Sequence, residues 1–227
     1  ISVQSVLLST DGLKEIAGTE STVSVFRKDK ALIHQSISAN NPSLWDIESP
    51  NMYKIVTKIF KSGEQTDETE TSFGFRTFEF DCDKGFILNG RQVKLKGVCS
   101  HQDYGLTGKA VPDNVYKYRI EMIKDMGANA YRTSHYPHSE ATMEALDENG
   151  ILVMDETRWY DSSDEGIEQL ETLIKRDRNH PSVILWSVGN EEPKHITEQG
   201  RRIAQTMIGA VKRLDPIRPV TTAVSYN

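Results

Sequence analysis

A carboxylate pair that follows an apolar stretch is the feature of this sequence best suited to chemistry. Residues 183–185 are all apolar, and polarity returns abruptly at Asn190, Glu191 and Glu192. A continuous apolar run is typical of a parallel strand buried on both faces, and functional side chains gather where such strands end. A carboxylic acid placed there can donate a proton to a reacting group, so Glu191 is the candidate proton donor. The simpler alternative is that both carboxylates only cap the next helix, where negative charge is favourable.

Three other predicted strands also end in polar side chains. These groups are His101-Gln102-Asp103, Arg132-Thr133-Ser134-His135 and Asp155-Glu156. If the strands are parallel, all of these groups lie at one rim of the sheet. Each has a simpler explanation when taken alone, because His101 could be a buried, hydrogen-bonded histidine and Arg132 could pair with Asp155 or Glu156. Together with residues 190–191 they predict a polar pocket suited to a sugar.

Two long segments resemble the signatures of glycoside hydrolase family two, the β-galactosidase and β-glucuronidase family. The acid/base signature is matched by Arg178-Asn179-His180-Pro181-Ser182, Trp186-Ser187 and Asn190-Glu191. The second signature is matched by Asn129-Ala130-Tyr131-Arg132-Thr133-Ser134-His135-Tyr136-Pro137, then Asp147, Gly150 and Ile151-Leu152-Val153-Met154. Thr142 departs from this pattern, since an apolar residue is usual at its position.

The resemblance implies a role for each residue of the predicted pocket. Glu191 becomes the catalytic acid/base. The residues that hold sugar hydroxyl groups and position the carboxylates are His101, Arg132, His135 and Asn190, joined by Asp103 and Glu156.

Two departures from the family pattern occur near these residues. Residues 97–103 lack the Asn-Arg pair usual before the histidine, and residues 157–161 lack the Glu and His that bind magnesium in large bacterial members, so we expect no essential metal and no cofactor.

The expected chemistry needs more than Glu191. Retaining hydrolysis of a β-glycoside uses two carboxyl groups about 5 to 5.5 Å apart, one donating the proton and one attacking the anomeric carbon. In the family the attacking Glu ends the seventh barrel strand, whereas five strands are predicted here. We therefore expect a fragment of a retaining β-galactosidase that lacks its nucleophile beyond residue 227 and is inactive alone. A β-glucuronidase of the same family and a non-catalytic carbohydrate-binding protein are the alternatives.

Alternating strand and helix patterns from Gly90 onward must position these side chains. The predicted strands span residues 93–98, 128–132, 151–155, 183–188 and 220–225, and the predicted helices span 115–126, 140–148, 165–176 and 199–214. Such a series could form an open, doubly wound sheet or the first part of an eight-stranded barrel, and periodicity does not separate the two. The family resemblance implies five strands of an α/β TIM barrel, within residues 81–227.

A different pattern precedes the barrel. Turn signals separate a series of predicted strands, at residues 1–8, 22–26, 31–37, 52–60 and 68–80. This pattern favours an immunoglobulin-like β-sandwich over residues 1–80. The first strand of the sandwich could lie before Ile1. Trp45 and Tyr53 are expected to be core anchors. Asn89-Gly90 between two apolar runs predicts a β-hairpin that marks the domain junction.

The amino-acid composition limits the kinds of molecule that this protein is expected to bind. The formal net charge of -6 and the lack of a basic block argue against nucleic acid. No apolar run approaches the roughly 18 residues of a membrane helix. The two cysteines, Cys82 and Cys99, predict free thiols and fit a reducing compartment, which slightly favours the cytoplasm over the periplasm or the exterior. The expected partner is a β-linked carbohydrate, and a homo-oligomer is one option for the parent enzyme.

Overall fold

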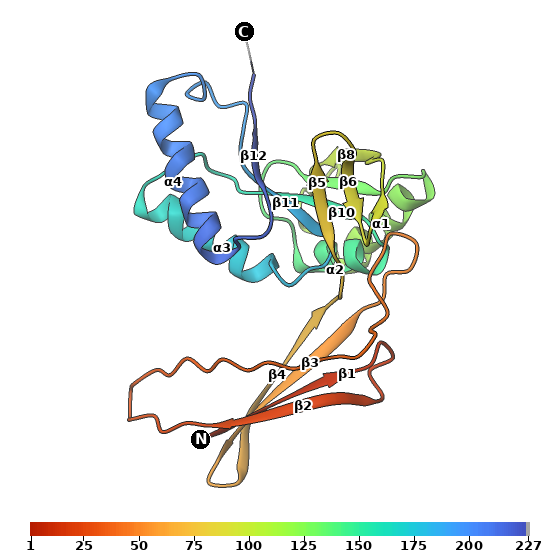
Figure 1. The fold of residues 1–227 in the computed structure, drawn as a ribbon. Helices are drawn as coiled ribbons and strands as arrows, with labels where there is room; N and C mark the ends of the chain where they lie inside the picture. The colour runs from red at the N-terminus through yellow and green to blue at the C-terminus, as the bar shows by residue number, and fades with distance from the viewer. Residues whose placement is uncertain (226–227) are drawn as a thin grey trace. The chain divides into compact units, whose positions relative to one another are not determined.

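The computed structural model describes residues 1–225 and divides the chain into two compact units (Figure 1). The first unit comprises Ile1–Trp45 and Asn51–Phe75, and the second comprises Asp46–Pro50 and the chain from Arg76 onward. The division into sequence domains at residues 80 and 81 stays a prediction. None of the helices within residues 1–225 combines the length and the apolar character that crossing a membrane requires.

The first unit contains one antiparallel sheet. Its strands are β1 (Ser2–Leu8), β2 (Glu15–Thr22), β3 (Tyr53–Lys61) and β4 (Glu64–Phe73), in the order β2-β1-β3-β4. Trp45 and Tyr53 are buried as expected, with 0% and 5% of their surfaces exposed. Tyr53 packs edge-on against Phe75 at 5.1 Å between ring centroids.

Two of the strand predictions for this unit are wrong. Residues 23–26 and 31–37 lie outside any strand, and the chain instead forms β2 over Glu15–Thr22. The β2 strand was missed because it is an edge strand of mainly polar and small residues, which leaves little apolar alternation in the sequence. Its conformation is set by antiparallel pairing with β1, in which Ser5 lies opposite Thr19.

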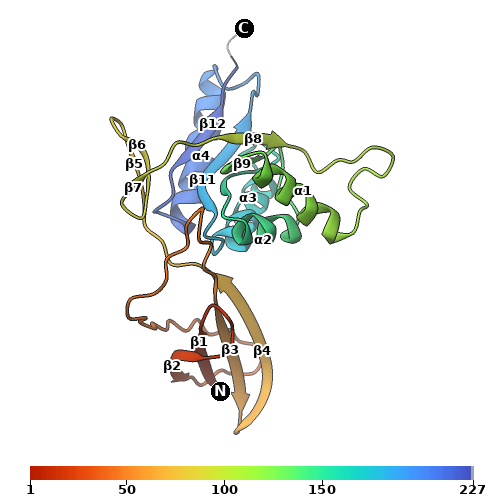
Figure 2. The same ribbon diagram turned by 90° about the vertical axis from the view of Figure 1, so that its right-hand side faces the viewer.

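The second unit opens with a small sheet of β5 (Phe78–Asp81), β6 (Gly85–Leu88) and β7 (Arg91–Gln92), which Figure 2 shows apart from the main sheet. Asn89 and Gly90 both have positive φ, at 51° and 79°, as the predicted two-residue hairpin turn requires. The first barrel strand is not residues 93–98 but β8 (Gly97–Ser100). The predicted strand began too early in the chain. The backbone N–H of Val93 bonds to Phe86 O, so Val93 is part of the hairpin.

The main sheet of the second unit is parallel and has five strands. β9 (Ala130–Thr133), β10 (Leu152–Glu156), β11 (Val183–Asn190) and β12 (Val220–Ala223) follow β8, and the spatial order is β12-β11-β10-β9-β8. A doubly wound sheet reverses its strand order partway, whereas the strands of a barrel are neighbours in chain order. The sequential order is therefore that of a barrel segment.

Helices connect consecutive strands of this sheet. They are α1 (Asp113–Asp125), α2 (Glu140–Glu148), α3 (Asp164–Asp177) and α4 (Glu198–Leu214), each within two residues of its predicted bounds. The side chains of Ser139, Ser163 and Thr197 accept backbone N–H bonds at the starts of α2, α3 and α4. One apolar core joins helices and strands, and its fully buried members include Met143, Leu146, Val153, Ile174, Val183 and Met207.

Candidate active site

Side chains alternate between the two faces of the parallel sheet, and this alternation decides which of them face the site. Tyr131, Val153 and Trp186 belong to the core that the helices cover. Successive side chains of a strand point to opposite faces, so Arg132, Met154 and Glu156 point away from the helices. That face is the interior side of a barrel.

Glu156 is the centre of the polar cluster on this face. Its carboxylate is fully buried and has three side-chain partners. Arg132 donates to Oε2 from Nε at 3.0 Å and from a terminal nitrogen at 2.7 Å. Ser187 donates to the same oxygen at 2.6 Å, and His135 Nδ1 lies 2.6 Å from Oε1. A buried carboxylate is tolerated when it is paired in this way. Glu156 is thus held by side chains from β9, from the residues just after β9, and from β11.

Arg132 extends the cluster to the end of β11. The terminal nitrogen that contacts Glu156 also donates to Asn190 Oδ1 at 2.7 Å. Asn190 is the last residue of β11 and pairs with Ala223 of β12. One guanidinium therefore fixes the side chain directly before Glu191.

Glu191 occupies the turn that follows. Its φ is +50°, a left-handed conformation that costs a non-glycine residue about 1 kcal/mol and is concentrated at functional sites. The backbone N–H of Glu191 bonds to Ala223 O at 2.8 Å, which ties the turn to β12. The side chain is exposed at the strand ends. Among the described residues, the carboxylate of Glu191 makes no hydrogen bond to the other predicted site residues.

His101 and Asp103 lie at the margin of the cluster, and both side chains are more than half exposed. The His101 ring meets the His135 ring edge-on at 5.2 Å between centroids. Asp103 accepts a hydrogen bond from the Tyr136 hydroxyl at 3.3 Å, and that hydroxyl accepts the Gln102 backbone N–H at 2.8 Å. The structure thus joins His101 and Asp103 to the cluster through contacts, not through direct bonds to Glu156.

Sequence reasoning gave no specific role to three contributors to the site. Ser187 bonds to Glu156, Tyr136 bonds to Asp103, and the Thr133 hydroxyl accepts the Glu156 backbone N–H at 2.8 Å. All three fall inside the two signature segments. Their position in those segments was the available signal, but serine, threonine and tyrosine are too common at strand ends to stand out without the register.

A second buried carboxyl group supports the first from the helix side of β10. Asp155 is fully buried and accepts a hydrogen bond at 2.9 Å from the same Thr133 hydroxyl. Burial raises the pKa of Asp155 well above its ordinary value, and the charge of Asp177 adds to the effect. The carboxyl of Asp155 therefore keeps its proton over a wider pH range than an exposed aspartate does.

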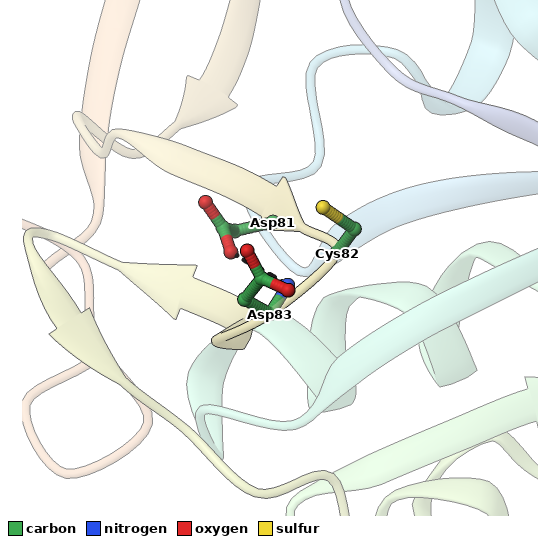
Figure 3. A group of neighbouring side chains, drawn as sticks. All are labelled: Asp81, Cys82 and Asp83. Atoms are coloured by element: carbon green, nitrogen blue, oxygen red, sulfur yellow. Dashed lines mark hydrogen bonds between the residues drawn. The ribbon is translucent and has the colours of Figure 1, made fainter.

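One group of potential metal ligands lies in the β5–β6 turn. Asp81, Cys82 and Asp83 offer ligand atoms within 4.8 Å of one another (Figure 3). Asp81 Oδ1 instead accepts the backbone N–H groups of Asp83 and Lys84 at 2.8 and 2.7 Å, and Cys82 and Asp83 are exposed. This is the side-chain bonding of an ordinary turn, and it carries no argument for a bound metal. The expectation of no essential metal stays a prediction.

The arrangement suits the binding of a polyhydroxylated ligand. The cluster combines a guanidinium, two imidazoles, carboxylates and an amide at one rim, which supplies both donors and acceptors for hydroxyl groups. Glu191 is the one carboxylate of the predicted set that is exposed directly beside the fixed Asn190. The Glu191 side chain is therefore accessible to a molecule bound at this rim.

Comparison with known proteins gives a consistent result across the chain. Residues 82–225 match the family described as "Glycosyl hydrolases family 2, TIM barrel domain", and residues 1–76 match "Glycosyl hydrolases family 2". The chain is 32% identical to the β-galactosidase BoGH2A of Bacteroides ovatus, over 97% of its own length and 31% of that protein. It is 31% identical to a β-glucuronidase of Bacteroides fragilis, over 96% of its length and 33% of that protein.

Solved structures agree with this result. A glycosyl hydrolase family 2 member from Bacteroides cellulosilyticus superposes with a TM-score of 0.92 and 36% identity, covering 100% of this chain and 32% of that protein. The chain thus spans about a third of the length of each of these three relatives.

Proposed function

Because the chain belongs to glycosyl hydrolase family 2, we propose that it carries the acid/base half of the active site of a retaining β-glycosidase. Glu191 is the acid/base in this proposal. Arg132, His135, Glu156 and Asn190 bind and orient the sugar around it, with His101 and Asp103 at the margin. The bond from Arg132 to Asn190 at 2.7 Å supports the proposal most, because it links the buried cluster to the residue preceding Glu191.

The geometry favours Glu191 over Glu156 as the carboxylate that handles the proton. A general acid must reach the glycosidic oxygen, and Glu191 is exposed at the rim. Glu156 is fully buried, and both of its oxygens are occupied by Arg132, His135 and Ser187. We therefore assign Glu156 to orientation of its partners. In this proposal the attacking carboxylate belongs to a residue other than Glu156 and Glu191.

The proposed substrate is a terminal β-D-galactoside. BoGH2A, named a β-galactosidase, supports this choice. A β-glucuronide is the second candidate, because several relatives and the solved structure from Parabacteroides merdae are named β-glucuronidases. A glucuronide differs from a galactoside in two places, the carboxylate at C6 and the configuration of the hydroxyl at C4. The two candidate substrates therefore differ in the groups that meet these two positions.

The experiment compares hydrolysis of nitrophenyl β-galactoside, β-glucuronide and β-mannoside by the full-length protein and its Glu191→Gln variant. A disaccharide with the accepted sugar at its non-reducing end is the second substrate. On the sugar that the protein accepts, the variant should lose roughly 10²-fold or more activity when the leaving group is a second sugar. Its kcat/KM should fall much less with an activated aryl leaving group, which departs without a proton. Its kcat should still fall, because the same carboxylate acts as the base when water hydrolyses the glycosyl-enzyme.

Glu192→Gln is the matched control, since it removes the neighbouring carboxylate and should keep most activity on both substrates. Equal losses in Glu191→Gln for good and poor leaving groups would contradict the acid/base assignment. A full-length protein that binds these sugars without hydrolysing any of them would support a non-catalytic carbohydrate-binding protein instead.

A further inference from the structure

A chain of polar contacts lies behind the Glu191 turn and meets the cluster described above where the Ser187 hydroxyl lies 3.5 Å from the Gly189 carbonyl oxygen. The carbonyl oxygen of Gly189, two residues before Glu191, accepts a hydrogen bond from the Thr222 hydroxyl at 3.0 Å. The same hydroxyl lies 3.2 Å from Nε2 of His195. The contacts therefore run from the loop after β11, through β12, and back to the end of β11.

These contacts define the protonation of His195. A hydroxyl has one hydrogen, and Thr222 uses it on the Gly189 carbonyl, which can only accept. The arrangement that satisfies both contacts has His195 Nε2–H donating to Thr222 Oγ1. The other ring nitrogen, Nδ1, is then an acceptor. It is buried and has no hydrogen-bond partner among the described residues.

The neutral ring fits this environment. Burial lowers the pKa of His195, against the opposing charge of Glu192. Protonation would place a second N–H at the buried Nδ1 without an acceptor there, which is unfavourable. The imidazole is therefore held as a neutral donor pointing at Thr222.

Packing leaves the ring and the turn little room to move. Tyr160 meets the His195 ring edge-on at 4.2 Å between centroids, and its hydroxyl donates to Gly200 O at 2.6 Å. A Cβ built on Gly189 would lie 2.7 Å from the Tyr160 ring and 3.1 Å from His195 Nε2. The absence of a side chain at Gly189 is what allows Tyr160 and His195 to press against the backbone that leads into Glu191.

We propose that His195 and Thr222 are positioning residues that fix the direction of the Glu191 carboxylate through the Gly189 carbonyl. This inference rests on the proposed role of Glu191 as the acid/base. The Thr222 hydroxyl and the Ala223 carbonyl hold the backbone on both sides of Asn190, at Gly189 and at Glu191. Loss of the Thr222 contact loosens the backbone at Gly189, although Asn190 is still held by Arg132 and Glu191 by Ala223. The carboxylate of Glu191 can then turn partly away from the glycosidic oxygen.

The test uses two matched pairs in the full-length protein. Thr222→Val removes the hydroxyl at constant shape, and Thr222→Ser keeps it. His195→Phe removes the donor, and His195→Gln places an amide N–H near the position of Nε2. For each variant, kcat/KM is measured over aryl β-glycosides whose leaving groups range from strongly to weakly acidic phenols.

We expect Thr222→Val and His195→Phe to lose about tenfold or more on the poorest leaving groups and little on the best, because only the former depend on proton donation. Thr222→Ser and His195→Gln should recover most of the loss. A general loss of folded protein would lower all substrates equally, so the steeper dependence on the leaving group is the diagnostic readout.

The outcomes separate this inference from the proposed function. If Glu191→Gln shows the leaving-group dependence but Thr222→Val and His195→Phe do not, the positioning role is overturned and the acid/base assignment stands. If Glu191→Gln itself shows no such dependence, the proposed function fails and the positioning role fails with it.

Discussion

Arg132 owes its importance to the shape of the guanidinium group. The group presents several N–H donors in a planar fork, and here the fork contacts Glu156 through two nitrogens and Asn190 through one of them. The Arg132 side chain is only 15% exposed and that of Glu156 is fully buried, so solvent screens this ion pair little. A lysine has the charge but cannot reach in both directions at once.

Replacing Arg132 should affect stability as well as activity. Arg132→Met leaves the Glu156 carboxylate buried with fewer partners, and we expect a loss of about 3 kcal/mol in the free energy of unfolding. Arg132→Lys should recover part of the stability but not the activity, since Asn190 loses its donor. Urea denaturation and hydrolysis of a nitrophenyl glycoside by the full-length protein measure the two effects.

Arg201→Met is the control for that experiment. Arg201 pairs with Glu198 on the exposed side of α4, where solvent screens the interaction, and its urea midpoint should stay near that of the unchanged protein. An Arg132→Met protein with an unchanged midpoint would mean that the buried pair contributes nothing to stability.

At the scale of elements, the residues at the start of the acid/base signature anchor the beginning of β11. The Val183 carbonyl accepts hydrogen bonds from both Arg76 and Arg218. His180 Nδ1 lies 2.6 Å from the Asp147 carboxylate at the end of α2. These contacts fix where β11 begins, and eight residues in one strand then carry that register to Asn190.

The β10 strand couples the two faces of the sheet. Asp155 faces the helices and Glu156 faces the site, and the Thr133 hydroxyl contacts both by donating to Asp155 and accepting from the Glu156 N–H. The raised pKa of Asp155, which follows from burial and from the charge of Asp177, makes this element sensitive to pH.

The sign of that sensitivity follows from proton binding. Between the unfolded pKa near 3.8 and the raised folded pKa, the folded protein holds a proton that the unfolded chain has lost. Stability from this group is therefore lost as the pH rises through that window. The Asp155→Asn variant keeps an acceptor for Thr133 and supplies an N–H toward Asp177. Its free energy of unfolding should therefore vary less with pH, and at pH 8 it should exceed that of the unchanged protein by about 1 kcal/mol. Urea denaturation at pH 5 and pH 8 measures this, and equal pH slopes for both proteins would contradict it.

At the scale of the whole molecule, the parallel sheet has two outer strands. Among the described residues, β8 pairs only with β9 and β12 pairs only with β11. Parallel strands are normally covered on all sides, and unpaired strand edges attract other chains.

We therefore expect the 227-residue polypeptide, produced alone, to self-associate as its concentration rises and to hydrolyse no β-glycoside. Sedimentation over a concentration series and a nitrophenyl glycoside assay beside the full-length protein measure the two outcomes. A monomeric polypeptide with normal turnover would show that a second functional carboxylate lies within these residues, with Glu156 the first to examine.

Much of the second unit could be predicted from the sequence, because strand and helix periods, the Asn89-Gly90 turn and the residue types at strand ends are properties of neighbouring residues. The helices lie within two residues of their predicted bounds for that reason. The polar edge strand β2 could not be predicted, since its partner β1 imposes its conformation. Periodicity left the strand order open, and the family resemblance supplied the barrel order that the structure shows. Only the tertiary structure decided the buried position of Glu156 between Arg132 and Ser187 and the contact of His195 with Thr222. Each depends on the register between segments far apart in the chain, and no local pattern encodes that register.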